Sequence, residues 1–121
     1  MNPTPSIDIN HGTPVSVNIV PLTDHVVIYK LWTRQSPADA WKMAGQGTIV
    51  HAAPDRHELG RLDPGAALAY WFGVAGPGGS AFEVRMTFNQ DLEGVGDRTL
   101  RVRGTTDATG GAVIEDRVVL R

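Results

Sequence analysis

Hydrophobic and polar residues alternate with a period of two along much of this chain. The clearest run covers residues 81–89, where four large apolar residues share one face and Glu83 and Arg85 lie on the other; the apolar residues are Phe82, Val84, Met86 and Phe88. Residues 15–19 and 99–103 alternate in the same way. A period of two is typical of half-buried strands. We therefore expect the four apolar residues to be buried and the two charged residues to be solvated.

Two segments are apolar on both faces. Residues 26–32 are interrupted only by Tyr29 and Lys30, which predicts a central strand. In residues 67–74, one face carries the larger side chains; they are Leu68, Tyr70, Phe72 and Val74. Successive side chains of a strand point to opposite faces. If these four residues face the core, Trp71 must therefore point away from it. Residues 113–120 predict a final strand.

Shorter strands are expected between these segments, which gives about eight strands in all; they cover residues 6–10, 48–52 and 56–59. Turn residues separate the strands at intervals typical of a sandwich or small barrel. We expect Gly76-Pro77-Gly78-Gly79 and residues 107–111 to close hairpins, because glycine supplies positive φ and proline a fixed φ. A short helical turn is expected near residues 36–42, where Ser36 can cap, Pro37 suits the first helical position and Asp39 favours the positive end of the helix dipole.

Two motifs resemble those of a known family. Residues 62–70, Leu-Asp-Pro-Gly-Ala-Ala-Leu-Ala-Tyr, look like the L-x-P-G corner of fibronectin type III and related immunoglobulin-like sandwiches. That family places an aromatic residue, usually Tyr, where this chain has Leu68, so the tyrosine corner is missing or displaced to Tyr70. Residues 104–112 are similar to the T-D-x-x-G hairpin of bacterial immunoglobulin-like and prealbumin-like domains. The resemblance implies an all-β immunoglobulin-like sandwich. It implies no ligand, because such corner motifs stabilise turns and do not form a binding site.

Length and charge narrow the possible partners. The 121 residues fit a single domain spanning residues 1–121, of which residues 1–5 could be disordered. A net charge of −2 disfavours nucleic acid, whose binding needs a positive excess. The absence of Cys excludes disulfides and thiolate zinc sites. We find no signal peptide and no membrane span in the sequence, so the compartment stays open, with the cytoplasm as the default expectation.

Candidate metal ligands are few. His51, Asp55 and His57 are close in sequence and could supply three ligands, but solvated loop histidines explain the same spacing. A second alternative is a calcium site formed by Asp91, Glu93 and Asp97, in a segment that equally fits an ordinary hairpin loop. We therefore predict no structural metal and no cofactor.

The sequence carries no recognisable catalytic motif. No serine lies in G-x-S-x-G or S-x-x-K, and no phosphate-binding glycine loop precedes a helix pattern. Catalytic residues converge in space rather than in sequence, so a small β-sandwich enzyme or a metal-dependent module stays as an alternative. The favoured hypothesis is a non-enzymatic binding or interaction module for a protein surface or a carbohydrate.

Tryptophan supplies the candidate binding residues. If the turn at residues 76–79 folds the next strand back beside its predecessor, Trp71 shares an outward face with Glu83 and Arg85, and Trp41 is a further candidate. An aromatic ring with flanking charges has the composition of an anchor surrounded by a polar rim. The alternatives are that these rings pack under the segment 36–47, and that Trp32 is the buried core tryptophan of a sandwich.

Overall fold

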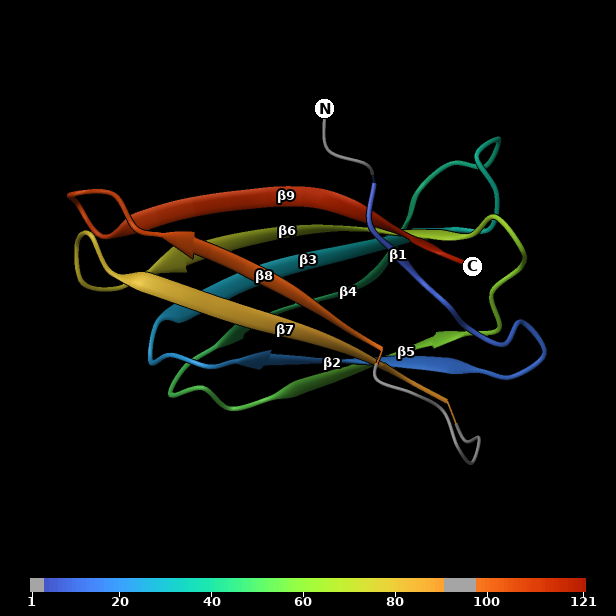
Figure 1. Cartoon of the computed structure of the whole chain (residues 1–121), viewed down its shortest axis with the longest axis horizontal. Coiled ribbons are helices and arrows are strands. Elements are labelled where there is room, and N and C mark those ends of the chain that lie inside the picture. The colour runs from blue at the N-terminus through green and yellow to red at the C-terminus, as the bar shows by residue number, and fades with distance from the viewer. Residues whose placement is uncertain (1–3, 91–97) are drawn as a thin grey trace.

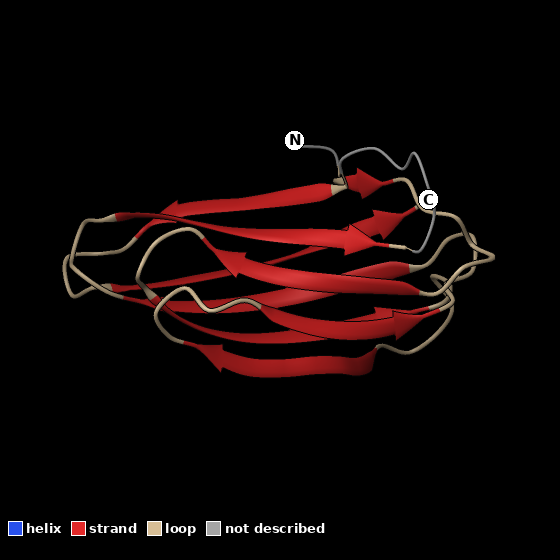
Figure 2. Cartoon of the chain, turned by 90° about the horizontal axis from the view of Figure 1, so that it is seen from below, coloured by secondary structure: helices blue, strands red, loops and turns tan. Residues whose placement is uncertain are grey.

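The alternating segments form two β-sheets packed face to face, with their strands roughly along the long axis of the molecule (Figures 1 and 2). The computed structural model describes residues 4–90 and 98–121. In spatial order, the five-stranded sheet contains β1 (Ser6–Ile7), β9 (Gly111–Leu120), β6 (Ala67–Ala75), β3 (Val26–Arg34) and β4 (Lys42–Ile49). The four-stranded sheet contains β5 (Asp55–Gly60), β2 (Val15–Pro21), β7 (Ala81–Asn89) and β8 (Thr99–Thr105). The architecture is therefore an all-β sandwich.

The core lies between the sheets and is built from the inward residues of both. The predicted register of β7 is confirmed, because Phe82, Val84, Met86 and Phe88 are buried while Glu83 and Arg85 alternate with them. The register of β6 is confirmed in the same way by Leu68, Tyr70, Phe72 and Val74. Burial of such side chains removes apolar area from water, which is the main favourable contribution to folding.

The two glycine-rich turns do not close hairpins, contrary to the sequence prediction. The turn after β6 and the turn after β8 each carry the chain from one sheet to the other, and they lie together at one end of the sandwich (Figure 1). The Gly76 amide donates to the Gly110 carbonyl at 2.9 Å, and the Gly79 amide donates to the Asp107 carbonyl at 3.0 Å. Gly110 has a φ of +89°, and a Cβ there would lie 2.1 Å from the Gly76 oxygen. Hydrogen bonding between the turns, rather than within hairpins, thus requires glycine here.

The predicted helical turn near residues 36–42 is also wrong. The Asp39 amide donates to the Ser36 carbonyl at 3.0 Å, which closes a single turn, and the described part of the chain contains no helix. The chain then enters β4, which pairs antiparallel with β3 from Val27↔Ile49 to Thr33↔Lys42. Ser36, Pro37 and Asp39 therefore form only the turn that connects β3 to β4, because Lys42 already pairs with Thr33.

The first described strand joins the last one. β1 runs parallel to β9, with Ser6 opposite Val119. The Val119 amide donates to the Pro5 carbonyl at 2.9 Å, and the Ile9 amide donates to the Arg121 carbonyl at 2.6 Å. Residues 1–5 were named from the sequence as a segment that could be disordered. Pro5 of this segment is hydrogen-bonded to β9. Within residues 4–90 and 98–121, no helix is long and apolar enough to cross a membrane.

Candidate functional site

The outer face of the five-stranded sheet carries an apolar strip along its central strand. The outward positions of β6 hold no polar side chain, and four of the five are alanine or glycine; they are Ala67, Ala69, Trp71, Gly73 and Ala75. Neighbouring outward positions on β3 and β9 carry larger residues, including Ile28, Trp32, Val113, Glu115 and Arg117. Small residues between larger ones make a shallow trough along β6. We call this outer surface of β9, β6, β3 and β4 the tryptophan face.

Trp71 lies in the floor of the trough and is half-buried. A Cβ added to Gly73 would lie 2.7 Å from Cη2 of Trp71, so the indole reaches along the strand over Gly73. Glycine at this position therefore makes room for the ring. The prediction that Trp71 points away from the core is confirmed.

The other two tryptophans lie on the same face. Trp32 pairs with Ala69 across β3 and β6, so it points outward and is not the core tryptophan of the sandwich. Trp41 immediately precedes β4, and the Arg34 guanidinium lies 4.3 Å from the centre of its ring. Such a cation–π contact fixes the ring and leaves it partly exposed. All three tryptophans of the chain are thus on the tryptophan face.

Two hollows open on this face, one on each side of Trp71. The Gly73 hollow, of about 460 Å³, is bounded mainly by apolar residues, among them Val26, Ile28, Ala75 and Val113. Val113 is 64% exposed and Ile28 is 47% exposed, so large apolar groups face water here. The Ala69 hollow, of about 330 Å³, is bounded by Trp32 and Trp41 together with Glu115 and Arg117. The two hollows therefore offer different chemistry.

Glu83 and Arg85 lie on the opposite side of the molecule from Trp71. β6 belongs to the five-stranded sheet and β7 to the four-stranded sheet, so the expected common face does not form. The sequence prediction was wrong because the turn at residues 76–79 crosses between the sheets. Trp41 is the only one of the predicted partners that shares the face of Trp71 within the described part of the chain.

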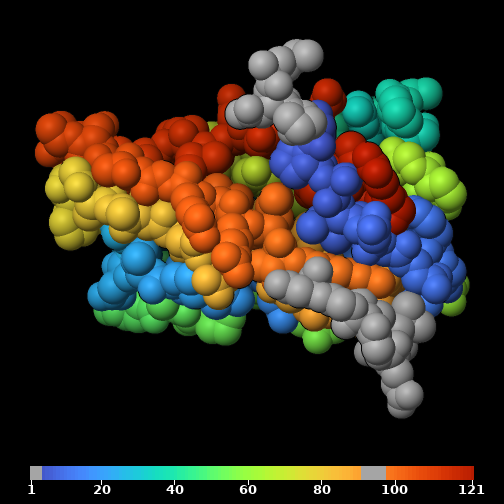
Figure 3. Space-filling model, viewed as in Figure 1, coloured from blue at the N-terminus to red at the C-terminus, as the bar shows by residue number. Residues whose placement is uncertain are grey.

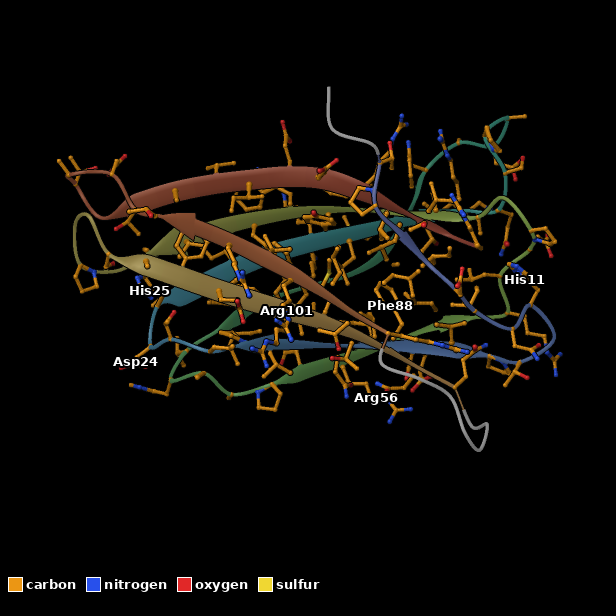
Figure 4. The ribbon with its side chains drawn as sticks, in the orientation of Figure 1. His11, Asp24, His25, Arg56, Phe88 and Arg101 are labelled. Carbon is orange, nitrogen blue, oxygen red and sulfur yellow. The ribbon has the colours of Figure 1, made fainter. Side chains whose placement is uncertain are left out.

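We call the outer surface of the four-stranded sheet the arginine face. Glu83 accepts hydrogen bonds from the guanidinium groups of Arg103 and Arg85, the latter at 2.7 Å. The hydrogen bond from Arg103 is the largest cause that holds the pKa of Glu83 below its usual value. Arg101 of β8 lies directly opposite Arg85 of β7 in the antiparallel pairing of these strands. Figures 3 and 4 view the molecule from the side of β8, and Figure 4 labels Arg101. This face therefore carries paired charges and polar groups.

The predicted metal candidates separate in space. His51 is exposed, and its Nδ1 lies 3.6 Å from Asp24. Asp55 and His57 instead point inward from β5 and meet Tyr29: the Tyr29 hydroxyl donates to Asp55 at 2.7 Å and so accepts from His57 Nε2 at 2.5 Å. No group of three His, Cys, Asp or Glu residues able to hold a metal forms among the described residues. The calcium candidates Asp91, Glu93 and Asp97 lie outside them.

The Tyr29–Asp55–His57 cluster links the two sheets along one edge. A Cβ on Gly47 would lie 2.7 Å from the Tyr29 hydroxyl, and one on Gly45 would lie 2.5 Å from His57 Nδ1. The glycines of β4 thus leave space for the Tyr29 and His57 side chains. Burial, and then the hydrogen bond to Asp55, raise the pKa of Tyr29 above its usual value. The arrangement joins β3 to β5 through side-chain hydrogen bonds.

A serine–histidine pair lies at the end of the sandwich marked by His25 in Figure 4. His25 Nε2 and Ser80 Oγ are 2.7 Å apart, and His25 Nδ1 is 2.7 Å from Thr23 Oγ1. Ser80 Oγ also donates to the Pro77 carbonyl at 2.6 Å, an oxygen that can only accept. The Thr106 hydroxyl also donates to the Pro77 carbonyl, at 2.6 Å, so the single serine proton has two acceptors within reach, the Pro77 carbonyl and His25 Nε2. Together with the Thr106 hydroxyl, 3.2 Å from Ser80 Oγ, the pair joins three loops, and the partner of His25 Nδ1 is the Thr23 hydroxyl rather than the carboxylate that usually orients a catalytic base.

The sequence prediction omitted several residues of the tryptophan face, namely Trp32, Ala69, Gly73, Glu115 and Arg117. A signal was present in residues 67–75, where every second position is apolar and small except Trp71. A solvated outer face of a central strand normally carries polar residues. Their absence from β6 could have marked this strand as a contact surface.

The comparisons with known proteins leave the site to be interpreted from its own geometry. The resemblance to fibronectin type III and bacterial immunoglobulin-like domains stays a prediction. No protein-family model, no curated protein and no solved structure matches the chain.

Proposed function

We propose that this protein is a non-enzymatic binding module and that its ligand docks on the tryptophan face. The observation that carries the proposal is the outer surface of β6, where five outward positions lack any polar side chain although all except Ala67 reach solvent. Contiguous apolar surface of this kind on a folded chain marks contact sites, whereas single exposed apolar residues are ordinary.

The side chains around β6 support a binding role. Indole rings provide a large apolar area with a polar N–H, and such groups dominate binding energy at interfaces. Ile28 and Val113 add exposed apolar area on the two neighbouring strands. Glu115 and Arg117 supply a polar rim on β9. An apolar centre with a polar rim is the usual composition of a contact surface.

The sequence left a protein surface and a carbohydrate as ligand classes, and a small enzyme as the alternative. The enzyme hypothesis gains no support from the Ser80–His25 pair, because the partner of His25 Nδ1 is the Thr23 hydroxyl and not a carboxylate. It gains none from the Tyr29 cluster, whose tyrosine is 1% exposed. The binding hypothesis is therefore favoured.

We also propose the immunoglobulin-like class for the sandwich. The neighbours β3-β6-β9 correspond to the C-F-G strands of that fold, and β5-β2 correspond to E and B. Between β6 and β9, the chain adds β7 and β8 to the four-stranded sheet. In this assignment the tryptophan face is the outer surface of the C-F-G sheet.

A ligand screen followed by chemical-shift mapping tests the binding site. The ¹⁵N-labelled chain is titrated with hits from glycan and protein-ligand screens, and backbone and indole N–H signals are followed. We expect the largest shifts in β3, β6 and β9, including the indole of Trp71. Shifts that cluster on the arginine face or in the end loops would contradict the proposal.

Two serine variants provide a matched comparison. Trp71→Ser removes an outward side chain from the tryptophan face, and Arg85→Ser removes one from the arginine face. We expect ligand affinity to fall by about tenfold or more in the first variant, about 1.4 kcal/mol, and to stay unchanged in the second. The opposite order would move the site to the four-stranded sheet.

A further inference from the structure

We propose that the Ala69 hollow is a subsite for one ring of a neutral oligosaccharide. This inference rests on the proposed function and names its ligand class. It uses five side chains from four segments of the chain; they are Trp32, Trp41, Ala69, Glu115 and Arg117.

The floor and one wall of the hollow are apolar. Ala69 pairs with Trp32 on β3 in the strand register, and its methyl group leaves the space beside the indole open. Trp41 extends the aromatic wall, and its ring is held by Arg34 at 4.3 Å. A pyranose ring presents a face of C–H groups, and a fixed indole presents a flat apolar surface of matching kind. Stacking of the sugar on this wall would therefore bury apolar area on both partners.

The opposite wall is polar and carries both signs of charge. Arg117 pairs with Ala69 from the β9 side, and Glu115 lies two residues before it on the same face. Neither side chain forms a salt bridge within residues 4–90 and 98–121, so both can bond a ligand. A carboxylate accepts hydrogen bonds and a guanidinium donates them, whereas a sugar hydroxyl does both. The hollow can thus hold adjacent hydroxyl groups along one edge of a ring.

The charge balance disfavours an anionic ligand. Glu115 and Asp116 bring two negative charges to the hollow and Arg117 brings one positive charge, so an anionic sugar would be repelled whereas a neutral one would not. An anionic glycan would instead be favoured by the arginine face, where Arg101 stands beside Arg85 and Glu83 is shared by two guanidinium groups. The two faces therefore predict opposite charge preferences.

The trough also favours a chain over a single ring. Outward residues on one strand repeat at about 6.7 Å, so Trp71 lies one repeat beyond Ala69 along β6. Its indole continues towards Gly73, away from Trp32. An oligosaccharide lying along β6 would therefore contact Trp32 with one ring and Trp71 with a following ring. The mainly apolar Gly73 hollow, by contrast, suits the aliphatic side chain of a protein partner.

Calorimetric titration with defined sugars tests the inference. The probes are neutral hexasaccharides of glucose, xylose, mannose and N-acetylglucosamine, together with an oligogalacturonate as the anionic counterpart. We expect at least one neutral probe to bind, with a change in tryptophan fluorescence, and the anionic probe to bind more weakly.

Two leucine variants, one on each outer face, locate the subsite. Ala69→Leu fills the hollow, while Ala81→Leu makes the same change at an exposed position of β7, on the arginine face. We expect the first to weaken binding by about tenfold or more and the second to change it by less than about twofold. Trp32→Ala should weaken binding as Ala69→Leu does. Thermal unfolding of each variant establishes that the chain is folded.

Several outcomes would overturn the inference. They are no binding of any neutral probe at millimolar concentration, preference for the anionic probe, or binding that Ala69→Leu leaves unchanged. A protein ligand that depends on Ile28 and Val113 but tolerates Ala69→Leu would overturn the sugar subsite and retain the proposed function. Ligand shifts confined to the arginine face would contradict both proposals.

Discussion

The strands β6 and β7 follow one another in the chain, bury the same kind of inner face and present opposite outer faces. Both carry four large apolar residues towards the core. Outward, β6 has alanine, glycine and tryptophan, whereas β7 has Glu83, Arg85, Thr87 and Asn89. The inner face is what folding requires of any strand in a sandwich. The outer face is free of that requirement. We therefore attribute the apolar outer residues of β6, compared with the polar ones of β7, to contacts with a ligand outside the chain.

The inner faces of the two strands should respond equally to truncation. Phe72→Ala and Phe88→Ala each remove a fully buried ring, and each should lower the free energy of unfolding by about 3–5 kcal/mol. Urea denaturation measures both. A loss below about 1 kcal/mol in either variant would break the equivalence of the inner faces.

The Tyr29–Asp55–His57 cluster, which joins the two sheets along one edge, should be the next most sensitive to substitution. Tyr29→Phe leaves Asp55 and His57 without their shared partner and should cost about 1–3 kcal/mol. A tyrosine ionises near pH 10 in the unfolded chain, and the folded chain raises the pKa of Tyr29. The folded state thus holds the proton more tightly, so the stability gained from it is complete below about pH 10 and is lost as the pH rises further.

Tyr70 provides the control for this edge. Burial, and then Asp116, raise the pKa of Tyr70 to about 12. Tyr70→Phe should therefore also reduce the alkaline loss of stability, but it breaks no bond to Asp55 or His57. If the two variants had equal stability at pH 7, the Tyr29 cluster would contribute nothing to joining the sheets.

Acid should distinguish the two outer faces. The pKa of Glu83 is lowered in the folded state, so its contribution to stability is present above about pH 4.3 and is lost as the pH falls through the folded value. Glu83→Gln should flatten the fall in urea midpoint between neutral and acid pH. Glu115→Gln, on the tryptophan face, is the matched control, because it makes the same substitution where no salt bridge is formed among the described residues.

The smallest effect on stability is expected at the exposed apolar residues. Ile28→Lys and Val113→Lys replace side chains that face water, and each should change the free energy of unfolding by about 0.5 kcal/mol or less. They should nevertheless reduce the binding of a hydrophobic dye, because they interrupt the apolar surface beside β6. Arg101→Lys on the arginine face should leave dye binding unchanged. Equal dye binding in all three variants would remove the contrast between the faces.

The sequence predicts which way side chains point more successfully than it predicts which strands are neighbours. A period of two placed Trp71 outward and Phe88 inward, because alternation follows from the geometry of one strand. It could not show that β6 and β7 belong to different sheets, since the same turn residues serve a hairpin and a crossing. Trp71 was therefore grouped with Glu83 and Arg85, which lie on the other outer face.

The β4 strand shows why local preference fails elsewhere. Gly45 and Gly47 indicate the end of an element when they are considered alone, yet both lie inside a strand. Their lack of a side chain makes room for His57 and Tyr29, which come from other strands. A requirement set by distant residues leaves no mark in the local sequence. The Tyr29 cluster could therefore not be assembled from the spacing of His51, Asp55 and His57.

The parallel pairing of β1 with β9 determines how the fold would respond to mechanical force. The hydrogen bonds that join Pro5 to Val119, Ile7 to Arg121 and Arg121 to Ile9 lie side by side between the two strands. Tension applied through residues 4 and 121 pulls β1 and β9 in opposite directions along their length. The bonds are then loaded together in shear, instead of opening one after another like a zipper. Forced unfolding is governed by the rate of the first opening step. Rupture of the short contact between β1 and β9 would be that step, so it would set the force that the sandwich withstands.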